Sequence, residues 1–129
     1  MALAEPRAAN APRRVSVLGS TGSVGCNTLD LIDRNPELFQ VVALTANRNV
    51  DALVAQAMKF RPEVVSIADP ACYRSLKDAL LNTGIEVAAG AQSVIEAAAH
   101  PADWVMAAIV GAAGLAPTIA AAGQGAILA

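Results

Sequence analysis

Apolar and polar positions follow two different periods along the chain. Short apolar runs flanked by glycine or polar residues are typical of strands buried in a parallel sheet. Longer stretches with apolar positions three and four residues apart predict helices that bury one face. The predicted strands are 15–18, 41–46, 64–68, 85–88, 105–110 and 127–129. The predicted helices are 23–34, 50–60, 69–81, 91–99 and 115–122.

Local signals set the ends of these helices. Asn35-Pro36 ends the first, because a residue before proline is disfavoured in helical geometry. Asn49 is a good N-cap for the second helix. Asp69-Pro70 supplies a cap and a proline at the first helical position of the third. The residues expected to face the sheet are Val24, Leu31 and Ile32 in the first helix and Leu53, Val54 and Ala57 in the second.

The alternation of strand and helix predicts the fold class. Such alternation implies a parallel sheet with right-handed crossovers. Six strands in two sets of three match the α/β, doubly wound, Rossmann-like dinucleotide-binding fold. Residues 1–13 are rich in alanine, proline and arginine and are expected to form a flexible tail before a single domain over 14–129. The last apolar run is expected to be an unfinished strand, which makes the chain a fragment of a longer protein.

A glycine-rich turn joins the first predicted strand to the first predicted helix. Its glycines, Gly19, Gly22 and Gly25, have the spacing G-x-x-G-x-x-G within a strand–helix–strand unit of about 30 residues. Glycines allow a tight turn and a close approach to a pyrophosphate, and we expect a positive φ at Gly22. The helix N-terminus attracts phosphate, and the hydroxyls of Thr21 and Ser23 add donors. The alternative is a turn that only packs the helix against the strand.

The end of the second strand indicates which nucleotide is bound. NAD-binding proteins usually place an acid there to accept a hydrogen bond from the ribose 2′-hydroxyl. This chain has Asn47-Arg48-Asn49 instead. Arg48 is suited to pair with a 2′-phosphate, which favours NADP(H) over NAD(H). The alternative is that Arg48 is a solvated side chain near the start of a helix.

Composition excludes several partners. The 129-residue chain has a net charge of −2 and 3% aromatic residues, which argues against nucleic acid. Residues 104–129 carry no charge over more than the ~20 residues that a membrane helix needs. This segment is rich in alanine and glycine and contains Pro117 and Gln124, so we expect soluble structure there and no membrane partner.

Few residues outside the glycine turn suggest chemistry. Cys26 and Cys72 are expected to be packing residues, and Trp104 and Met106 to belong to the core. The only histidine, His100, is expected to be a solvated residue at a helix end, unable to form a triad or a metal site alone. The carboxylates are scattered. We therefore predict a cofactor site, but neither a catalytic centre nor a metal site, within this chain.

Four stretches resemble one enzyme family. They are LGSTGSVGCNTLDLI, RNPELFQVVALTANRNV, DWVMAAIVGAAGLAPTIAA and GQGAILA, within residues 14–129. Together they are similar to the 1-deoxy-D-xylulose 5-phosphate reductoisomerase family. The resemblance implies the N-terminal NADPH-binding domain of a homodimeric enzyme of isoprenoid-precursor synthesis. Such enzymes rearrange 1-deoxy-D-xylulose 5-phosphate and reduce it with NADPH to 2-C-methyl-D-erythritol 4-phosphate, assisted by magnesium or manganese. The two cysteines, which form neither a CxxC pair nor a dense framework, predict a cytoplasmic location.

The resemblance also implies particular site residues. Thr21, Gly22, Ser23 and Val24 match the family's phosphate turn, and Arg48 and Asn49 match its basic-Asn pair. Asn47 stands where many members have glycine, and 107–114 resembles the loop along the cofactor.

The remaining functions of the family are expected outside this chain. Its catalytic and metal-binding residues lie beyond Ala129, so the phosphorylated sugar and the cation are expected to bind through missing domains. The chain alone is expected to bind NADPH without turnover. Two alternatives remain: another NADP-dependent enzyme such as a semialdehyde dehydrogenase, which also opens with G-x-x-G-x-x-G, and a nucleotide-binding module without chemistry.

Overall fold

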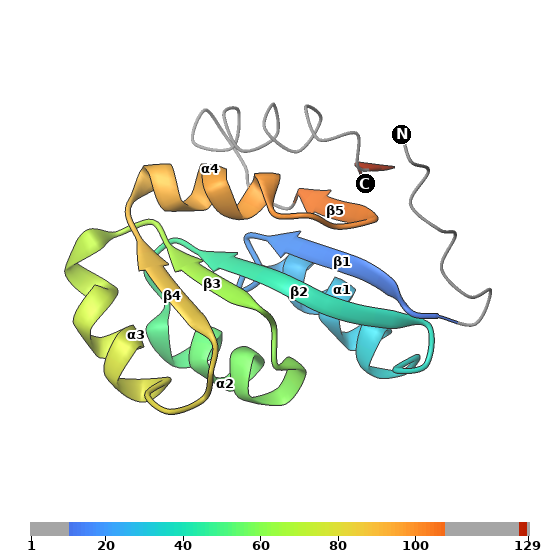
Figure 1. Ribbon diagram of the computed structural model, residues 1–129, viewed down its shortest axis with the longest axis horizontal. Coiled ribbons are helices and arrows are strands. Elements are labelled where there is room, and N and C mark those ends of the chain that lie inside the picture. Colours follow the sequence, from blue (N-terminus) through green and yellow to red (C-terminus); the bar gives the residue numbers. More distant parts are fainter. Residues whose placement is uncertain (1–10, 108–126, 129) are drawn as a thin grey trace.

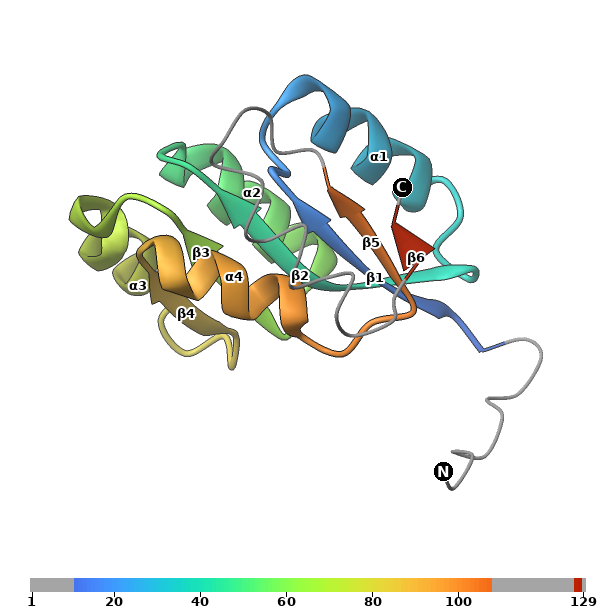
Figure 2. The same cartoon turned by 90° about the horizontal axis from the view of Figure 1, so that it is seen from above.

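A parallel sheet between two layers of helix organises the protein (Figures 1 and 2). The computed structural model describes residues 11–107 and 127–128. In it α1, α2 and α3 cover one face of the sheet and α4 covers the other (Figure 1). The strands are β1 (Arg13–Leu18), β2 (Phe39–Ala46), β3 (Val64–Ile67), β4 (Glu86–Ala89), β5 (Trp104–Ala107) and β6 (Ile127–Leu128). The helices are α1 (Ser23–Asp33), α2 (Val50–Phe60), the 3₁₀ turn η1 (Pro70–Cys72), α3 (Tyr73–Ala79) and α4 (Ala91–Ala99).

The strand order confirms a doubly wound sheet but not its expected division. The order is β4-β3-β2-β1-β5-β6, and every described pairing is parallel. Four strands, β1 to β4, therefore lie on one side of the reversal point between β1 and β5. The expectation of two sets of three was wrong, because β4 extends the first set by one strand before α4 carries the chain back to β5. The predicted helix 115–122 lies outside the described residues.

The buried face of α1 differs from the one that the apolar pattern predicted. Gly25, Leu29 and Ile32 are buried, whereas Val24 and Leu31 are 55% and 56% exposed. Only Ile32 of the three predicted inner residues was correct. The close approach of Gly25 to the preceding turn fixes the rotation of the helix, which directs Val24 and Leu31 outwards.

The second helix and the core follow the prediction more closely. Leu53 and Ala57 of α2 are fully buried, and Val54 is partly buried against the same core. The predicted caps are confirmed as well. Asn49 Oδ1 accepts a hydrogen bond from Ala52 N at 3.1 Å, and Asp69 Oδ1 accepts one from Ala71 N at 2.9 Å. The third helix begins as the 3₁₀ turn η1 and continues as α3.

The prediction for β5 was correct for one residue and wrong for another. Met106 is partly buried against the core. Trp104, by contrast, is 37% exposed, and its ring lies 5.9 Å from that of Phe39. The fully buried residue of this strand is Val105. Trp104 opens the strand, so its ring covers the start of β2 without entering the interior.

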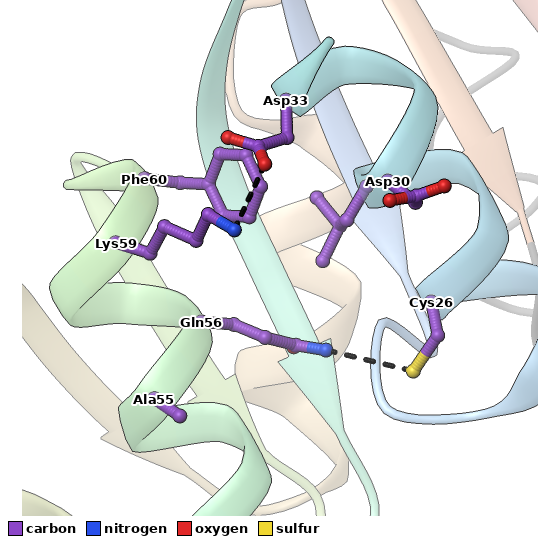
Figure 3. Close-up of a pocket in the computed structure, with 8 residues that line it drawn as sticks. Cys26, Asp30, Asp33, Ala55, Gln56, Lys59 and Phe60 are labelled. Atoms are coloured by element: carbon purple, nitrogen blue, oxygen red, sulfur yellow. Dashed lines mark hydrogen bonds and ion pairs between the residues drawn. The ribbon is translucent and has the colours of Figure 1, made fainter.

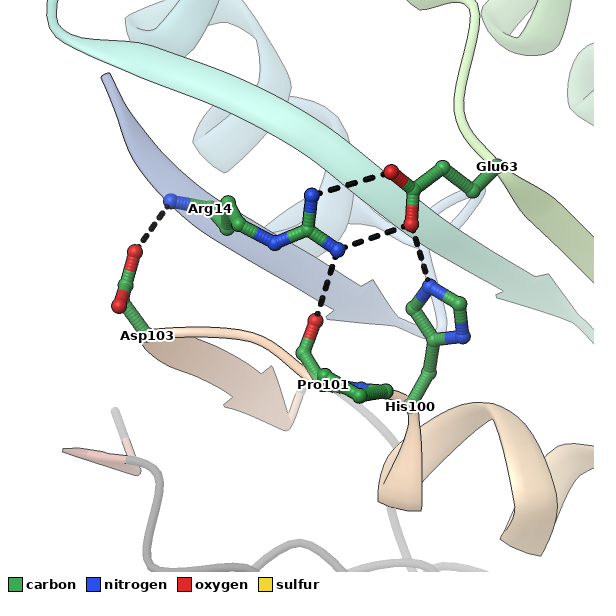
Figure 4. Close-up of polar contacts among 5 residues, drawn as sticks. All are labelled: Arg14, Glu63, His100, Pro101 and Asp103. Carbon is green, nitrogen blue, oxygen red and sulfur yellow. Dashed lines mark hydrogen bonds and ion pairs between the residues drawn. The ribbon is translucent and has the colours of Figure 1, made fainter. Parts of the chain in front are cut away.

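A polar network ties the amino ends of several elements together (Figure 4). Arg14 donates to both carboxylate oxygens of Glu63, at 3.0 and 2.8 Å. His100 Nε2 lies 2.7 Å from Glu63 Oε1. The hydrogen bonds from Arg14 and then from His100 lower the pKa of Glu63 from 4.5 to about 2. The expectation that His100 is only a solvated helix-end residue was wrong, because Glu63 lies within its reach.

This network also reaches the start of β5. Arg14 Nη2 donates to the Pro101 carbonyl oxygen at 3.2 Å, and Arg14 N donates to Asp103 Oδ2 at 2.8 Å. Its members thus join β1 to the segments before β3 and β5. Within the ranges 11–107 and 127–128, no helix has the length and apolar character needed to span a bilayer.

Candidate functional site

The glycine turn after β1 has its positive φ at the first glycine. Gly19 has φ +76°, whereas Gly22 has φ −78° and ψ 175°. The expected positive φ at Gly22 was therefore wrong. Gly19 provides the left-handed conformation that reverses the chain after Leu18. Gly22 is the N-cap residue of α1.

The other two glycines serve different purposes. A Cβ on Gly25 would lie 2.6 Å from Ser20 Cα, which no side chain can tolerate without a shift of the backbone. A Cβ on Gly22 would meet only Gly19 O, at an ordinary 3.7 Å. Packing of α1 on the turn therefore requires glycine at position 25. At position 22 the fold leaves room for a side chain, so an outside partner must explain any need for glycine there.

The N-terminus of α1 presents free hydrogen-bond donors. The first N–H groups of a helix have no partner within the helix. The N-cap residue Gly22 offers no side-chain cap, and within the part of the chain that the structure describes no acceptor bonds to the N–H of Ser23 or Val24. Gly22, Ser23 and Val24 are exposed, and Thr21 is half-buried. These donors, with the helix dipole, suit an anion such as phosphate.

Two residues that the sequence analysis did not select hold the turn in place. Thr45 of β2 accepts a hydrogen bond from Gly19 N on its Oγ1 at 2.9 Å and one from Ser20 N on its carbonyl oxygen at 2.8 Å. Gln56 of α2 accepts from Ser20 Oγ at 2.7 Å and donates to Ser20 O at 2.8 Å. A threonine inside an apolar strand was the available signal for Thr45, since buried hydroxyls require a partner.

The segment after β2 carries the other predicted residues. Asn47, Arg48 and Asn49 are all exposed. The Asn49 side chain already serves as the cap of α2. The Arg48 side chain is 75% exposed, and its Nε lies 3.3 Å from Asp69 Oδ2. Arg48 is therefore not simply solvated: Asp69 holds one edge of the guanidinium, and no described residue hydrogen-bonds to its other nitrogens.

The structure brings the two predicted segments to one edge of the sheet. β1 and β2 are parallel neighbours, and both segments follow the carboxyl ends of these strands. On the other side of β1, Leu18 pairs with Ala107 of β5. The glycine turn thus lies at the reversal point of a doubly wound sheet, where this fold class binds its ligands. Of the predicted loop 107–114, only Ala107 lies within the described residues.

The Cys26 thiol faces a groove beside the turn (Figure 3). This groove of about 240 Å³ lies between α1 and α2, and an ion pair of 2.9 Å between Lys59 Nζ and Asp33 Oδ2 spans it. Cys26 is exposed, with Sγ 3.6 Å from Ser20 O and from Thr21 O, so its expected packing role was wrong. Cys72, by contrast, is partly buried against the core, as expected. Among the described residues, no three metal-ligating side chains gather.

The fold and the site together define a dinucleotide-binding domain. Comparison with known proteins gives its family: residues 15–129 match the family model described as 1-deoxy-D-xylulose 5-phosphate reductoisomerase. The chain therefore belongs to this family.

Individual relatives agree with the family match. The reductoisomerase of Rhodospirillum centenum is 64% identical over 91% of this chain and 29% of its own length. That of Caulobacter vibrioides is 52% identical over 95% of this chain and 31% of its own. The chain thus spans about 30% of the length of these curated relatives.

Two solved structures are similar to this one. The reductoisomerase of Zymomonas mobilis in complex with NADPH has a TM-score of 0.89 and 52% identity, over 92% of this chain and 31% of that one. A reductoisomerase in complex with NADPH, fosmidomycin and magnesium has a TM-score of 0.85 and 38% identity, over 90% of this chain and 29% of that one.

Proposed function

We propose that residues 14–129 form the NADPH-binding domain of a reductoisomerase. The enzyme rearranges and reduces 1-deoxy-D-xylulose 5-phosphate to 2-C-methyl-D-erythritol 4-phosphate, a step of isoprenoid-precursor synthesis. The proposal rests on one observation: the N-terminus of α1, with its free N–H groups, lies at the same edge of the sheet as Arg48, which follows β2. A relative that is 52% identical to this chain was solved in complex with NADPH. The semialdehyde dehydrogenase alternative is set aside by the family match.

Each end of the cofactor has a set of residues that fits its charge. The N–H groups of Ser23 and Val24, with the hydroxyls of Thr21 and Ser23, bind the pyrophosphate, and the bare backbone of Gly22 lets it approach. Arg48 binds the 2′-phosphate through the edge of the guanidinium that Asp69 leaves open. Asn47 and Asn49 flank the ribose end, and Asn49 keeps its cap of α2 while doing so.

The chemistry itself is shared with the rest of the enzyme. NADPH supplies the hydride, and this domain binds and orients it. The magnesium or manganese ion and the phosphorylated sugar bind to other parts of the enzyme, as the family resemblance implies. We also propose the homodimer that the family resemblance implies and the cytoplasmic location that the cysteine pattern favours.

Ligand-dependent thermal unfolding tests the cofactor assignment. A ligand that binds only the folded state raises the melting temperature with its concentration. NADPH is expected to raise the melting temperature of the purified protein, whereas ATP at the same concentration is not. Equal stabilisation by both would favour a general nucleotide-binding module. Oxidation of NADPH that depends on 1-deoxy-D-xylulose 5-phosphate and a divalent cation, by an enzyme carrying this domain, tests the reaction.

A further inference from the structure

Ser20 of the glycine turn is clamped by a single amide side chain. Ser20 is fully buried. Its hydroxyl donates to Gln56 Oε1 at 2.7 Å, and its carbonyl oxygen accepts from Gln56 Nε2 at 2.8 Å. The two contacts fix the orientation of the amide, because a flipped amide would place its oxygen against the Ser20 carbonyl oxygen. Gln56 thus satisfies both polar groups of Ser20 that face α2.

The position of Ser20 makes this clamp relevant to the turn. Ser20 directly follows Gly19, which carries the positive φ, and Gly25 of α1 packs against its Cα. A shift of Ser20 therefore moves the start of α1, where the N–H groups of Ser23 and Val24 lie. The Ser20 hydroxyl also lies 3.2 Å from the Thr45 carbonyl oxygen. Gln56 is accordingly the link between the phosphate turn and α2.

We propose that Gln56 is a positioning residue for the pyrophosphate end of the cofactor. It does not touch the cofactor; it fixes Ser20 and so the direction in which the first N–H groups of α1 point. The inference rests on the proposed function of the turn as a phosphate site. Since Gln56 acts at the pyrophosphate and Arg48 at the 2′-phosphate, their variants have different signatures.

Two substitutions separate positioning from packing. Gln56→Leu keeps the size of the side chain and removes both hydrogen bonds to Ser20, together with the 3.8 Å contact from Gln56 Nε2 to Cys26 Sγ. Gln56→Glu keeps an acceptor for the Ser20 hydroxyl but sets an oxygen against the Ser20 carbonyl oxygen. Both substitutions are expected to weaken the binding of NADPH and of NADH by the same factor, about tenfold. The reason is that a buried polar group of Ser20 loses its partner and the turn relaxes. Adenosine 2′-phosphate lacks the pyrophosphate and is expected to bind both variants as it binds wild type.

Gln40→Leu is the matched control. Gln40 is exposed on β2 near its amino end, opposite to the edge that carries the turn. The same substitution there is expected to change the affinity of none of the three ligands. Circular dichroism establishes which variants are folded, and calorimetric titration gives the dissociation constants.

The outcomes distinguish this inference from the proposed function. Folded Gln56 variants that bind NADPH and NADH like wild type would overturn the positioning role, as would a loss restricted to NADPH. Unfolding of both variants would overturn it in favour of a purely structural role. A wild-type protein that binds neither NADPH nor NADH would instead overturn the proposed function itself. An equal loss for both dinucleotides, with adenosine 2′-phosphate unaffected, supports the inference.

Discussion

Gly25 packs against Ser20 so closely that a Cβ on Gly25 would lie 2.6 Å from Ser20 Cα. The first turn of α1 therefore rests directly on the backbone that precedes it. This contact brings the helix N-terminus to the carboxyl end of β1. The contact also distinguishes two glycines that look equivalent in the sequence. Packing requires glycine at position 25, whereas Gly22 faces solvent and has room for a side chain within the fold.

We predict that Gly25→Ala destabilises the protein. The added methyl group meets backbone atoms of Gly19 and Ser20, which cannot rotate away as a side chain would. Overpacking of this kind costs about 1–3 kcal/mol of unfolding free energy. Urea unfolding measures the change. An unfolding free energy equal to that of wild type would show that the helix moves away at no cost.

Gly22→Val is the counterpart and has the opposite signature. The fold leaves room for a Cβ at this position, and φ −78° suits any residue. The free energy of unfolding is therefore expected to stay within about 1 kcal/mol of wild type. NADPH binding is expected to be lost, because the side chain occupies the space of the pyrophosphate. A titration in which Gly22→Val binds NADPH normally would remove Gly22 from the site.

Arg48→Ala is predicted to weaken the binding of NADPH much more than the binding of NADH. The variant removes a charged partner of the 2′-phosphate, an effect of about 1.5–3 kcal/mol. Alanine is a cleaner change than glutamate here, since a glutamate would stand beside Asp69 and repel it as well. Arg74 is an exposed arginine on α3, and Arg74→Ala is the control for the change in net charge. Equal weakening of both cofactors would show that Arg48 does not select the 2′-phosphate.

The network around Glu63 predicts that the stability of the folded protein depends on pH in the acidic range. Because hydrogen bonds from Arg14 and His100 lower the pKa of Glu63 from 4.5 to about 2, the folded state resists protonation of this carboxylate more than the unfolded state does. Its contribution to stability is therefore complete above about pH 4.5 and is lost as the pH falls towards 2. Glu63→Gln is expected to be less stable than wild type near neutral pH and to lose less stability across that acidic range.

Urea unfolding of both proteins at several pH values measures this difference. Glu96→Gln, which removes an exposed carboxylate from α4, is the control and is expected to follow the wild-type curve. Parallel curves for wild type and Glu63→Gln between pH 4.5 and 2 would show that the network contributes nothing to acid stability.

The alternation of apolar runs with helical patterns predicted the ends of the described helices and strands to within about two residues, except for the predicted end of the 105–110 strand, which lies outside the described residues. It succeeded because a parallel strand buried on both faces and a one-sided helix differ in period, and because Asn49 and Asp69 are strong caps. The order of strands was less accessible. Nothing local in β4 tells whether it extends the first set of strands or begins the second, since that choice depends on how α4 crosses the sheet.

Part of the site could be predicted because it consists of local sequence features. A glycine turn and an arginine after the next strand are local features, and the fold brings them to one edge. Thr45 and Gln56 were missed because their partners are groups of Gly19 and Ser20, 25 to 36 residues away in the sequence. The rotation of α1, which exposes Val24, depends on the contact of Gly25 with Ser20 and not on the apolar pattern of the helix.

Calorimetric titration of the wild-type protein with NADPH and with NADH tests whether the glycine turn and Arg48 together form an NADPH site. If the turn binds pyrophosphate and Arg48 binds the 2′-phosphate, both cofactors bind at one site per chain and NADPH binds at least about tenfold more tightly, the lower end of one charged hydrogen bond. Failure to bind NADPH would show that the turn is not a cofactor site, and equal affinity for the two cofactors would show that Arg48 does not bind the 2′-phosphate.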